Sequence, residues 1–179
     1  VDGIFAFALL VEERERGGNT GMISQSGEIV LGGLDSRNMG FSHVISSGNS
    51  CNVKVEDYLD FLVDDEDTKV VAAYMEGVTK PERLVAAFQK AALKKKPVVV
   101  LKTGRSAKSQ ELAKSHTGSL SGADKVLRAV FKRYGVVEAG DLEELMSLAA
   151  AFSWLEELPK GERCVFMHVS GGEAGVMAD

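Results

Sequence analysis

The chain is 179 residues long, 45% of them hydrophobic, and it carries 26 acidic against 21 basic residues, a formal net charge of −5. This length and composition predict one folded domain with part of a second and exclude a disordered chain. The acidic balance, with no basic stripe interleaved with aromatic residues, argues against a nucleic-acid partner.

The cysteines and the start of the chain bear on its location. Cys51 and Cys164 are too few for a disulfide framework and lack the spacing of a metal site. The apolar run at residues 4–11 is far shorter than the roughly 20 residues that span a bilayer, and no signal-peptide pattern surrounds it. We therefore expect a cytoplasmic protein with no membrane partner and no metal ligands. Because the chain opens on Val1 and stops inside an expected helix, we also expect it to be a piece of a longer protein.

Apolar, β-branched runs alternate with amphipathic stretches along the chain, which is typical of parallel strands joined by crossover helices. The predicted strands, in chain order, are residues 20–24, 41–46, 69–75, 97–102 and 136–138. The predicted helices are residues 28–37, 55–63, 80–94, 122–134 and 142–158. Together they predict an α/β domain with a flavodoxin-like, doubly wound sheet of five parallel strands. Sheets of this kind bind ligands beyond the carboxyl ends of their strands.

A further apolar run at residues 163–169 is expected to be a strand, and it ends in Ser170-Gly171-Gly172. The stretch VFMHVSGGEAGV weakly echoes GMISQSGEIV at the first strand, a likeness that chance could also produce. We therefore predict a flavodoxin-like domain over residues 1–158 and a linker over 159–162. Residues 163–179 are expected to be the first strand and helix start of a second, truncated flavodoxin-like domain.

The first predicted strand leads into Ser24-Gln25-Ser26-Gly27, just before a helix. Such a turn leaves backbone N–H groups and the positive end of the helix dipole facing outward, which suits an anion, phosphate above all. The alternative is an ordinary serine N-cap. A serine nucleophile elbow is disfavoured, because G-x-S-x-G needs glycine where Ser24 and Glu28 stand. The chain also lacks a P-loop motif.

The next three strand exits supply further polar groups. After the second strand, Gly48 and Asn49 lie in a polar turn that is either a substrate contact or a plain surface loop. After the third, Glu76 is a lone carboxylate at the end of an apolar strand, and it either serves a nearby reaction or caps the following helix. After the fourth, Lys102 begins a hydrophilic segment that leads to His116.

His116 lies in KSHTGSLSG, which has too many glycines and serines to be a helix. Because strands three and four are neighbours in this topology, we expect Glu76 and His116 to meet above the sheet edge. A carboxylate bonded to one imidazole nitrogen fixes the tautomer and leaves the other nitrogen as a nucleophile or base. The alternative is a surface histidine without function. His43 and His168 fall within predicted strands and are expected in the core or on a sheet face.

Five stretches of the chain resemble the NDP-forming acyl-CoA synthetases, the superfamily of succinyl-CoA synthetase and the ADP-forming acetyl-CoA synthetases. They are, in order, ISQSG, ISSGNSCNVKVEDYLDFL, AAYMEGV, KPVVVLKTGRS and SHTGSLSG, and the resemblance runs from about Gly21 to the end. In that family an acyl-CoA reacts with phosphate to give an acyl phosphate, which phosphorylates a histidine; the phosphohistidine then passes its phosphoryl group to ADP or GDP. The resemblance implies a fragment of an acid-thiol ligase (acyl-CoA + phosphate + ADP = carboxylic acid + CoA + ATP), inactive by itself.

The same resemblance implies roles for particular residues. His116 matches the phosphorylated histidine, and Glu76 matches the carboxylate that orients it. Ser26 and Gly27 match the start of a helix whose N-terminus holds the phosphoryl group. Ser170-Gly171-Gly172 match the start of the second such helix, at the head of the next domain.

Partners also follow from the resemblance. A CoA-binding Rossmann domain is expected before Val1, and a nucleotide-binding ATP-grasp domain further on or in another subunit of an oligomer. These domains are expected to bind most of the substrates, which are acyl-CoA, phosphate, coenzyme A, and ADP or ATP with Mg²⁺; no prosthetic group is expected. Glu28 departs from the family, which usually has a small residue there, and its carboxylate would repel phosphate if it faced the site.

Two other functions compete with the ligase. The first is a non-catalytic, acyl-CoA-sensing region of a protein lysine acetyltransferase, which the resemblance also covers. The presence of both Glu76 and His116 favours the enzyme over this sensor. The second is a flavin carrier, which is disfavoured because the first strand exit lacks the hydroxyl-rich phosphate loop typical of flavin binding.

Overall fold

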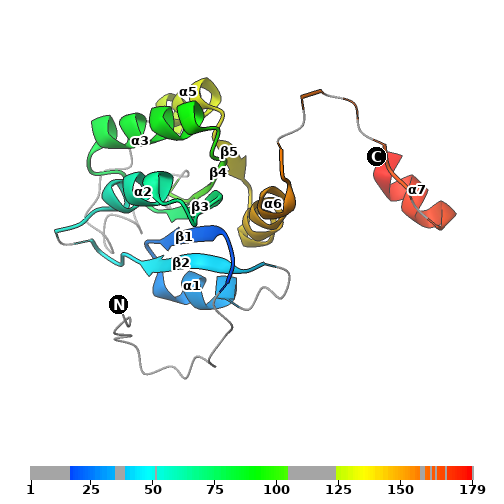
Figure 1. Ribbon diagram of the computed structural model, residues 1–179, viewed down its shortest axis with the longest axis horizontal. Helices are drawn as coiled ribbons and strands as arrows, with labels where there is room; N and C mark the ends of the chain where they lie inside the picture. The colour runs from blue at the N-terminus through cyan, green and yellow to red at the C-terminus, as the bar shows by residue number, and fades with distance from the viewer. Residues whose placement is uncertain are drawn as a thin grey trace.

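The computed structural model describes residues 17–34, 39–50, 52–104, 124–157, 160–161, 163, 165–167 and 169–178. Its strands form one sheet in which all neighbours are parallel (Figure 1). They are β1 Thr20–Ser24, β2 Phe41–Ser46, β3 Val70–Met75, β4 Val98–Lys102 and β5 Val137–Ala139. Across the sheet the order is β2-β1-β3-β4-β5, which is the flavodoxin-like order. The predicted fold class is confirmed, and each predicted strand end is correct to within about one residue.

The helices follow the predicted positions, with one marked difference at a described end. They are α1 Gly27–Leu34, α2 Val55–Asp64, α3 Pro81–Lys94, α5 Asp124–Tyr134, α6 Leu142–Trp154 and α7 Gly171–Ala178. The predicted last residues of α1, 35–37, lie outside the described residues. α6 ends earlier than the predicted residue 158, because Leu155 already has an extended backbone, with a ψ of 125°.

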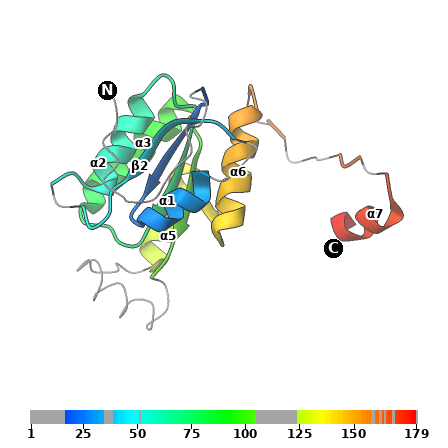
Figure 2. The same ribbon diagram turned by 90° about the horizontal axis from the view of Figure 1, so that it is seen from below.

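Helices cover both faces of the sheet (Figure 2): α2, α3 and α5 pack on one face, and α1 and α6 on the other. Side chains of a strand alternate between the faces. The residues of β3 accordingly divide between the two cores, with Val71, Ala73 and Met75 in one and Val70, Ala72 and Tyr74 in the other. All of them are buried. This burial on both sides explains why a central parallel strand forms a continuous apolar run rather than an alternating one.

The predicted strand at 163–169 is not found among the residues that the structure describes there. A strand needs a neighbour to bond its ladder of N–H and C=O groups, and no described strand of the sheet pairs with this stretch. Val165, Met167 and Val169 are more than nine-tenths exposed. α7 has no buried residue and lies apart from the sheet and its helices in both views (Figures 1 and 2). The division into two domains therefore stays a prediction.

The first turn of α2 provides a test of the fold's response to acid. Asp57 accepts a hydrogen bond from the Lys54 N–H at 2.9 Å and forms ion pairs with Lys80, at 3.4 Å, and Arg83. The Lys54 N–H, and then the two cations, lower the pKa of Asp57 from 3.8 to about 2. Because folding lowers this pKa, the ionised carboxylate contributes stability above about pH 4 and loses that contribution as the pH falls toward 2.

We therefore expect Asp57→Asn to reduce the free energy of unfolding more at pH 7 than at pH 3. Urea unfolding at both pH values measures this difference. Asp67→Asn, which replaces an exposed aspartate, is the control. Equal losses for Asp57→Asn at the two pH values would show that the carboxylate charge does not contribute to stability.

Candidate active site

The carboxyl ends of the parallel strands bring several predicted site residues to one edge of the sheet. Ser24, the last residue of β1, is in register with Ser46 of β2 and Tyr74 of β3. Met75 of β3 is in register with Lys102 of β4. The residues that follow these strands therefore lie together at the point where the chain order reverses between β1 and β3, which is where such folds bind ligands.

The turn after β1 is built from the two serines that flank Gln25. The Ser24 hydroxyl accepts the Ser26 N–H at 3.0 Å and donates to the Ser26 carbonyl at 2.6 Å. α1 begins at the next residue, Gly27. None of the described residues accepts a hydrogen bond from the N–H of Gly27, Glu28 or Ile29. These donors and the positive end of the helix dipole make the turn suitable for an anion, as predicted.

Glu28, the departure from the family pattern, lies exposed in the first turn of α1. A carboxylate in a first turn interacts favourably with the helix dipole. This exposed position fits a dipole partner, and solvent screens such a charge from neighbouring groups.

The backbone around Glu76 is held by side chains from two other elements. The Gln25 side-chain oxygen accepts the N–H groups of Glu76, at 2.6 Å, and Gly77, at 3.1 Å. The ammonium group of Lys102 donates to the Glu76 carbonyl at 2.8 Å. The Glu76 side chain itself is half-buried. It therefore extends from a fixed stretch of backbone beside the turn after β1.

Tyr74 adds a polar group close to the Glu76 carboxylate. Its hydroxyl accepts a hydrogen bond from Thr103 at 3.2 Å. Burial, and to a lesser degree the Glu76 carboxylate, raises the pKa of Tyr74. The tyrosine therefore stays protonated and can donate a hydrogen bond at this edge at neutral pH.

Among the described residues, no hydrogen bond joins the Glu76 carboxylate to the start of α3, so its alternative role as the cap of that helix has no support. Glu56, a fully buried residue in the first turn of α2, binds the two residues before α3 instead. Its carboxylate accepts the N–H groups of Thr79, at 2.7 Å, and Lys80, at 2.9 Å. Together with Gln25, it occupies four N–H groups between β3 and α3, so this connection has few donors left for an anion.

The turn after β2 adjoins the same edge. The Ser47 N–H donates to the Ser24 carbonyl at 2.8 Å, which ties this turn to the end of β1. Gly48 has a φ of +49°, a left-handed backbone that glycine adopts readily. Gly48 is half-buried and Asn49 is exposed. The structure therefore places the two residues near the candidate site, and their contact with a substrate stays a prediction.

The remaining predicted residues lie either outside the described residues or away from this edge. His116 lies in 105–123, outside the described residues, as do His168 and both cysteines. Ser170 precedes α7, which is remote from Ser26; its hydroxyl accepts the Glu173 N–H, and the Glu173 carboxylate accepts the Ser170 N–H, both at 3.2 Å. This reciprocal pair is a capping box. Gly171 and Gly172 open that helix. His43 lies on β2 and meets the edge of Phe61, as expected of a sheet-face residue.

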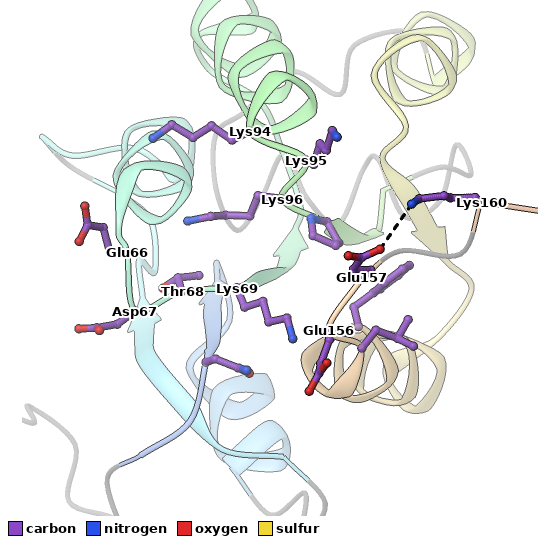
Figure 3. A pocket seen from close by; sticks show the side chains of 14 residues that line it. Glu66, Asp67, Thr68, Lys69, Lys94, Lys95, Lys96, Glu156, Glu157 and Lys160 are labelled. Atoms are coloured by element: carbon purple, nitrogen blue, oxygen red, sulfur yellow. Dashed lines mark ion pairs between the residues drawn. The ribbon is translucent and has the colours of Figure 1, made fainter.

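A hollow of about 920 Å³ lies at the opposite edge of the sheet (Figure 3). Five lysines and four carboxylates line it. The Lys96 ammonium donates to the carbonyls of Leu62, at 3.0 Å, and Asp65, at 2.6 Å, and the Lys69 ammonium to that of Ser153 at 3.4 Å. Lys69 and Lys96 thus bind backbone, Lys94 and Lys160 pair with Asp64 and Glu157, and the nearly balanced charge offers little field for a phosphate.

Within the described part of the chain, no three His, Cys, Asp or Glu side chains are placed to hold a metal ion. No helix there combines the length and the apolar character that crossing a bilayer requires.

Comparison with known proteins identifies the fold's family. The sequence profile of the succinyl-CoA ligase like flavodoxin domain matches residues 17–152. The chain belongs to this family. The matched segment of this succinyl-CoA ligase like flavodoxin domain contains all five strands and the candidate residues Ser26, Glu76 and His116. Ser170 and its two glycines lie beyond it.

Similar proteins include ADP-forming acetate–CoA ligases. The II subunit alpha from Pyrococcus furiosus is 39% identical over 165 residues, 90% of this chain and 35% of the relative. The ligase of Methanocaldococcus jannaschii is 40% identical over 164 residues, 90% of this chain and 23% of the relative. The solved Ca. Korarchaeum cryptofilum dinucleotide forming acetyl-coenzyme A synthetase 1, in complex with phosphate and ADP, has a TM-score of 0.74 at 33% identity and covers 84% of this chain and 33% of that chain. This flavodoxin domain thus spans 23–35% of these proteins.

Two residues of the site were missed by sequence reasoning. Gln25 stands between two serines that already accounted for the turn, and Glu56 has the position of an ordinary acidic residue in a first turn. Their partners lie 51 and 23 residues further along the chain. No local signal in the sequence of the domain marks such contacts.

Proposed function

We propose that this domain is the phosphohistidine-bearing part of an ADP-forming acyl-CoA synthetase, which converts acyl-CoA, phosphate and ADP into a carboxylic acid, CoA and ATP. The observation that carries the proposal is that one sheet edge holds both the first N–H groups of α1, which no described residue accepts, and the Glu76 carboxylate on a fixed backbone. The family and the names of the similar ligases support the same reaction class.

The proposed chemistry proceeds through His116. Phosphate displaces CoA from the acyl-CoA and gives an acyl phosphate. An imidazole nitrogen of His116 attacks the phosphorus; the N–P bond forms as the P–O bond to the acyl group breaks, and the carboxylate leaves. A terminal oxygen of ADP then attacks the phosphorus, the N–P bond breaks, and neutral imidazole returns.

Three parts of this chain have distinct tasks in the proposal. Glu76 binds the second imidazole nitrogen, fixes the tautomer and offsets the charge of the phosphorylated ring. The first-turn N–H groups at Gly27 hold the phosphoryl oxygens, and each helix end contributes about 0.3 to 1 kcal/mol, more where it is partly buried. Gly48 and Asn49 contact the substrate from the neighbouring turn. Phosphoryl transfer depends chiefly on such positioning and charge stabilisation.

The proposal also assigns functions to the other domains of the full-length protein. A CoA-binding Rossmann domain and an ATP-grasp domain supply the other substrate sites, and Mg²⁺ arrives with the nucleotide. Residues 163–179 begin a second flavodoxin-like domain, whose Ser170-Gly171-Gly172 helix start faces the phosphoryl group from the other side. The exposed apolar side chains at 165–169 support this assignment, because side chains of that kind are usually covered in the complete protein. We expect a cytoplasmic oligomer.

The test is phosphate labelling of the full-length protein. Incubation with γ-labelled ATP and Mg²⁺ should give a protein-bound phosphate that is labile in acid and stable in base, and added ADP should remove it. A label stable in acid would contradict the histidine assignment. Binding of acyl-CoA without any label would instead indicate the regulatory alternative, the acyl-CoA-sensing region of a lysine acetyltransferase.

A further inference from the structure

Gln25 makes the one side-chain contact, among the described residues, that joins the turn after β1 to the N–H groups of Glu76 and Gly77. Its own N–H donates to the Tyr74 carbonyl at 3.2 Å, so its backbone continues the pairing of β1 with β3. Only 9% of Gln25 is exposed. Water therefore has little access to replace the side-chain oxygen if that oxygen is removed.

The two bonds fix a direction as well as a position. An oxygen that accepts two consecutive N–H groups sets the planes of both peptides, and these planes decide where the Glu76 side chain leaves the backbone. The Lys102 ammonium holds the carbonyl of the same residue from β4. The N–H and C=O groups of Glu76 are thus both bound by side chains from neighbouring strands.

A neutral amide suits this position for a chemical reason. A carboxylate would accept the same two N–H groups, but it would place a second negative charge near Glu76 and near the helix start that receives phosphate. An apolar side chain of similar length would leave two N–H groups without a partner. Glutamine supplies the acceptor without the charge.

We infer that Gln25 is a positioning residue for phosphoryl transfer, which holds the Glu76 carboxylate in the direction that orients His116. This inference rests on the proposed function. It predicts that the effect of Gln25 on the reaction passes through Glu76.

The experiment compares three variants of the full-length protein: Gln25→Met, which keeps the length and removes the acceptor; Glu76→Gln; and the double variant. Gln25→Met should slow labelling by ATP about tenfold, the value of roughly one hydrogen bond, with little change in the KM for ATP. In the Glu76→Gln background it should cause no further loss, because its effect passes through that carboxylate. Independent, multiplied losses would overturn the inference.

Hydrogen exchange supplies a readout that does not depend on the reaction. Exchange at the amides of Glu76 and Gly77, followed by mass spectrometry with residue-level fragmentation, should be about tenfold faster in Gln25→Met than in the wild type. The control, Gln25→Glu, keeps an acceptor oxygen and should retain slow exchange.

The two readouts separate the possible failures. Unchanged exchange in Gln25→Met would overturn the contact, and faster exchange with a normal labelling rate would overturn the positioning role. A wild-type protein that takes up no label rejects the proposed function and the positioning role that depends on it, while the exchange result still shows whether Gln25 holds this backbone.

Discussion

Full-length protein carrying His116→Ala should take up no acid-labile phosphate from labelled ATP and Mg²⁺. The proposed reaction needs a nitrogen nucleophile that is neutral at pH 7, and an alanine provides no atom to form the N–P bond. We expect the loss to be complete within detection. Autoradiography after acid and base treatment, with mass spectrometry of the wild-type peptide, measures it.

The matched control is the histidine on β2. His43→Ala removes a ring of β2 that contacts Phe61 of α2, away from the carboxyl edge of the sheet, and it should leave labelling at the wild-type level. Undiminished labelling of His116→Ala would reject the nucleophile assignment. Loss of label in His43→Ala, with normal labelling of His116→Ala, would identify His43 as the nucleophile instead.

Glu76→Gln should lower the rate of labelling by about 10²-fold or more, within the range for groups that assist proton transfer or fix a tautomer. The amide can still accept one hydrogen bond from the imidazole, but it no longer offsets the positive charge of the phosphorylated ring. The fold should persist, because the backbone at Glu76 is held by Gln25 and Lys102 and the substituted side chain is half-buried.

Rapid-quench labelling gives the rate, and thermal unfolding of the same samples gives the stability. Glu66→Gln, an exposed residue at the opposite edge of the sheet, is the matched control and should label normally. A normal rate for Glu76→Gln would leave Glu76 with a structural role only. A large fall in melting temperature would assign the effect to folding.

The fold could be predicted from the sequence because its signals are local. Buried parallel strands such as β3 appear as short apolar runs, and the amphipathic helices between them show which face each buries. The strand at 163–169 was predicted from the same kind of run, yet the described residues there form no strand. An apolar run indicates a preference for the strand conformation, but a strand forms only where a neighbouring strand pairs with it.

The candidate site was predictable only in part. Glu76 could be proposed from the sequence because it is a lone carboxylate at the end of an apolar strand. Ser26 could be proposed because it stands in a turn before a helix, where unbonded N–H groups suit an anion. Glu56 and Gln25 could not be proposed, because their importance comes from contacts made after folding. The approach to α3 shows the difference: sequence proximity suggested that Glu76 binds there, and the structure places Glu56 of another helix on the two residues before α3.

The binding of Thr79 and Lys80 by Glu56 has a consequence for chimeric enzymes. Residues 76–80 are bound at one end by Gln25 and at the other by Glu56, side chains that lie outside the segment itself. Transplanting this segment alone into a homologue would separate it from both acceptors. A graft intended to transfer the carboxylate's geometry therefore has to carry three separated pieces of sequence together.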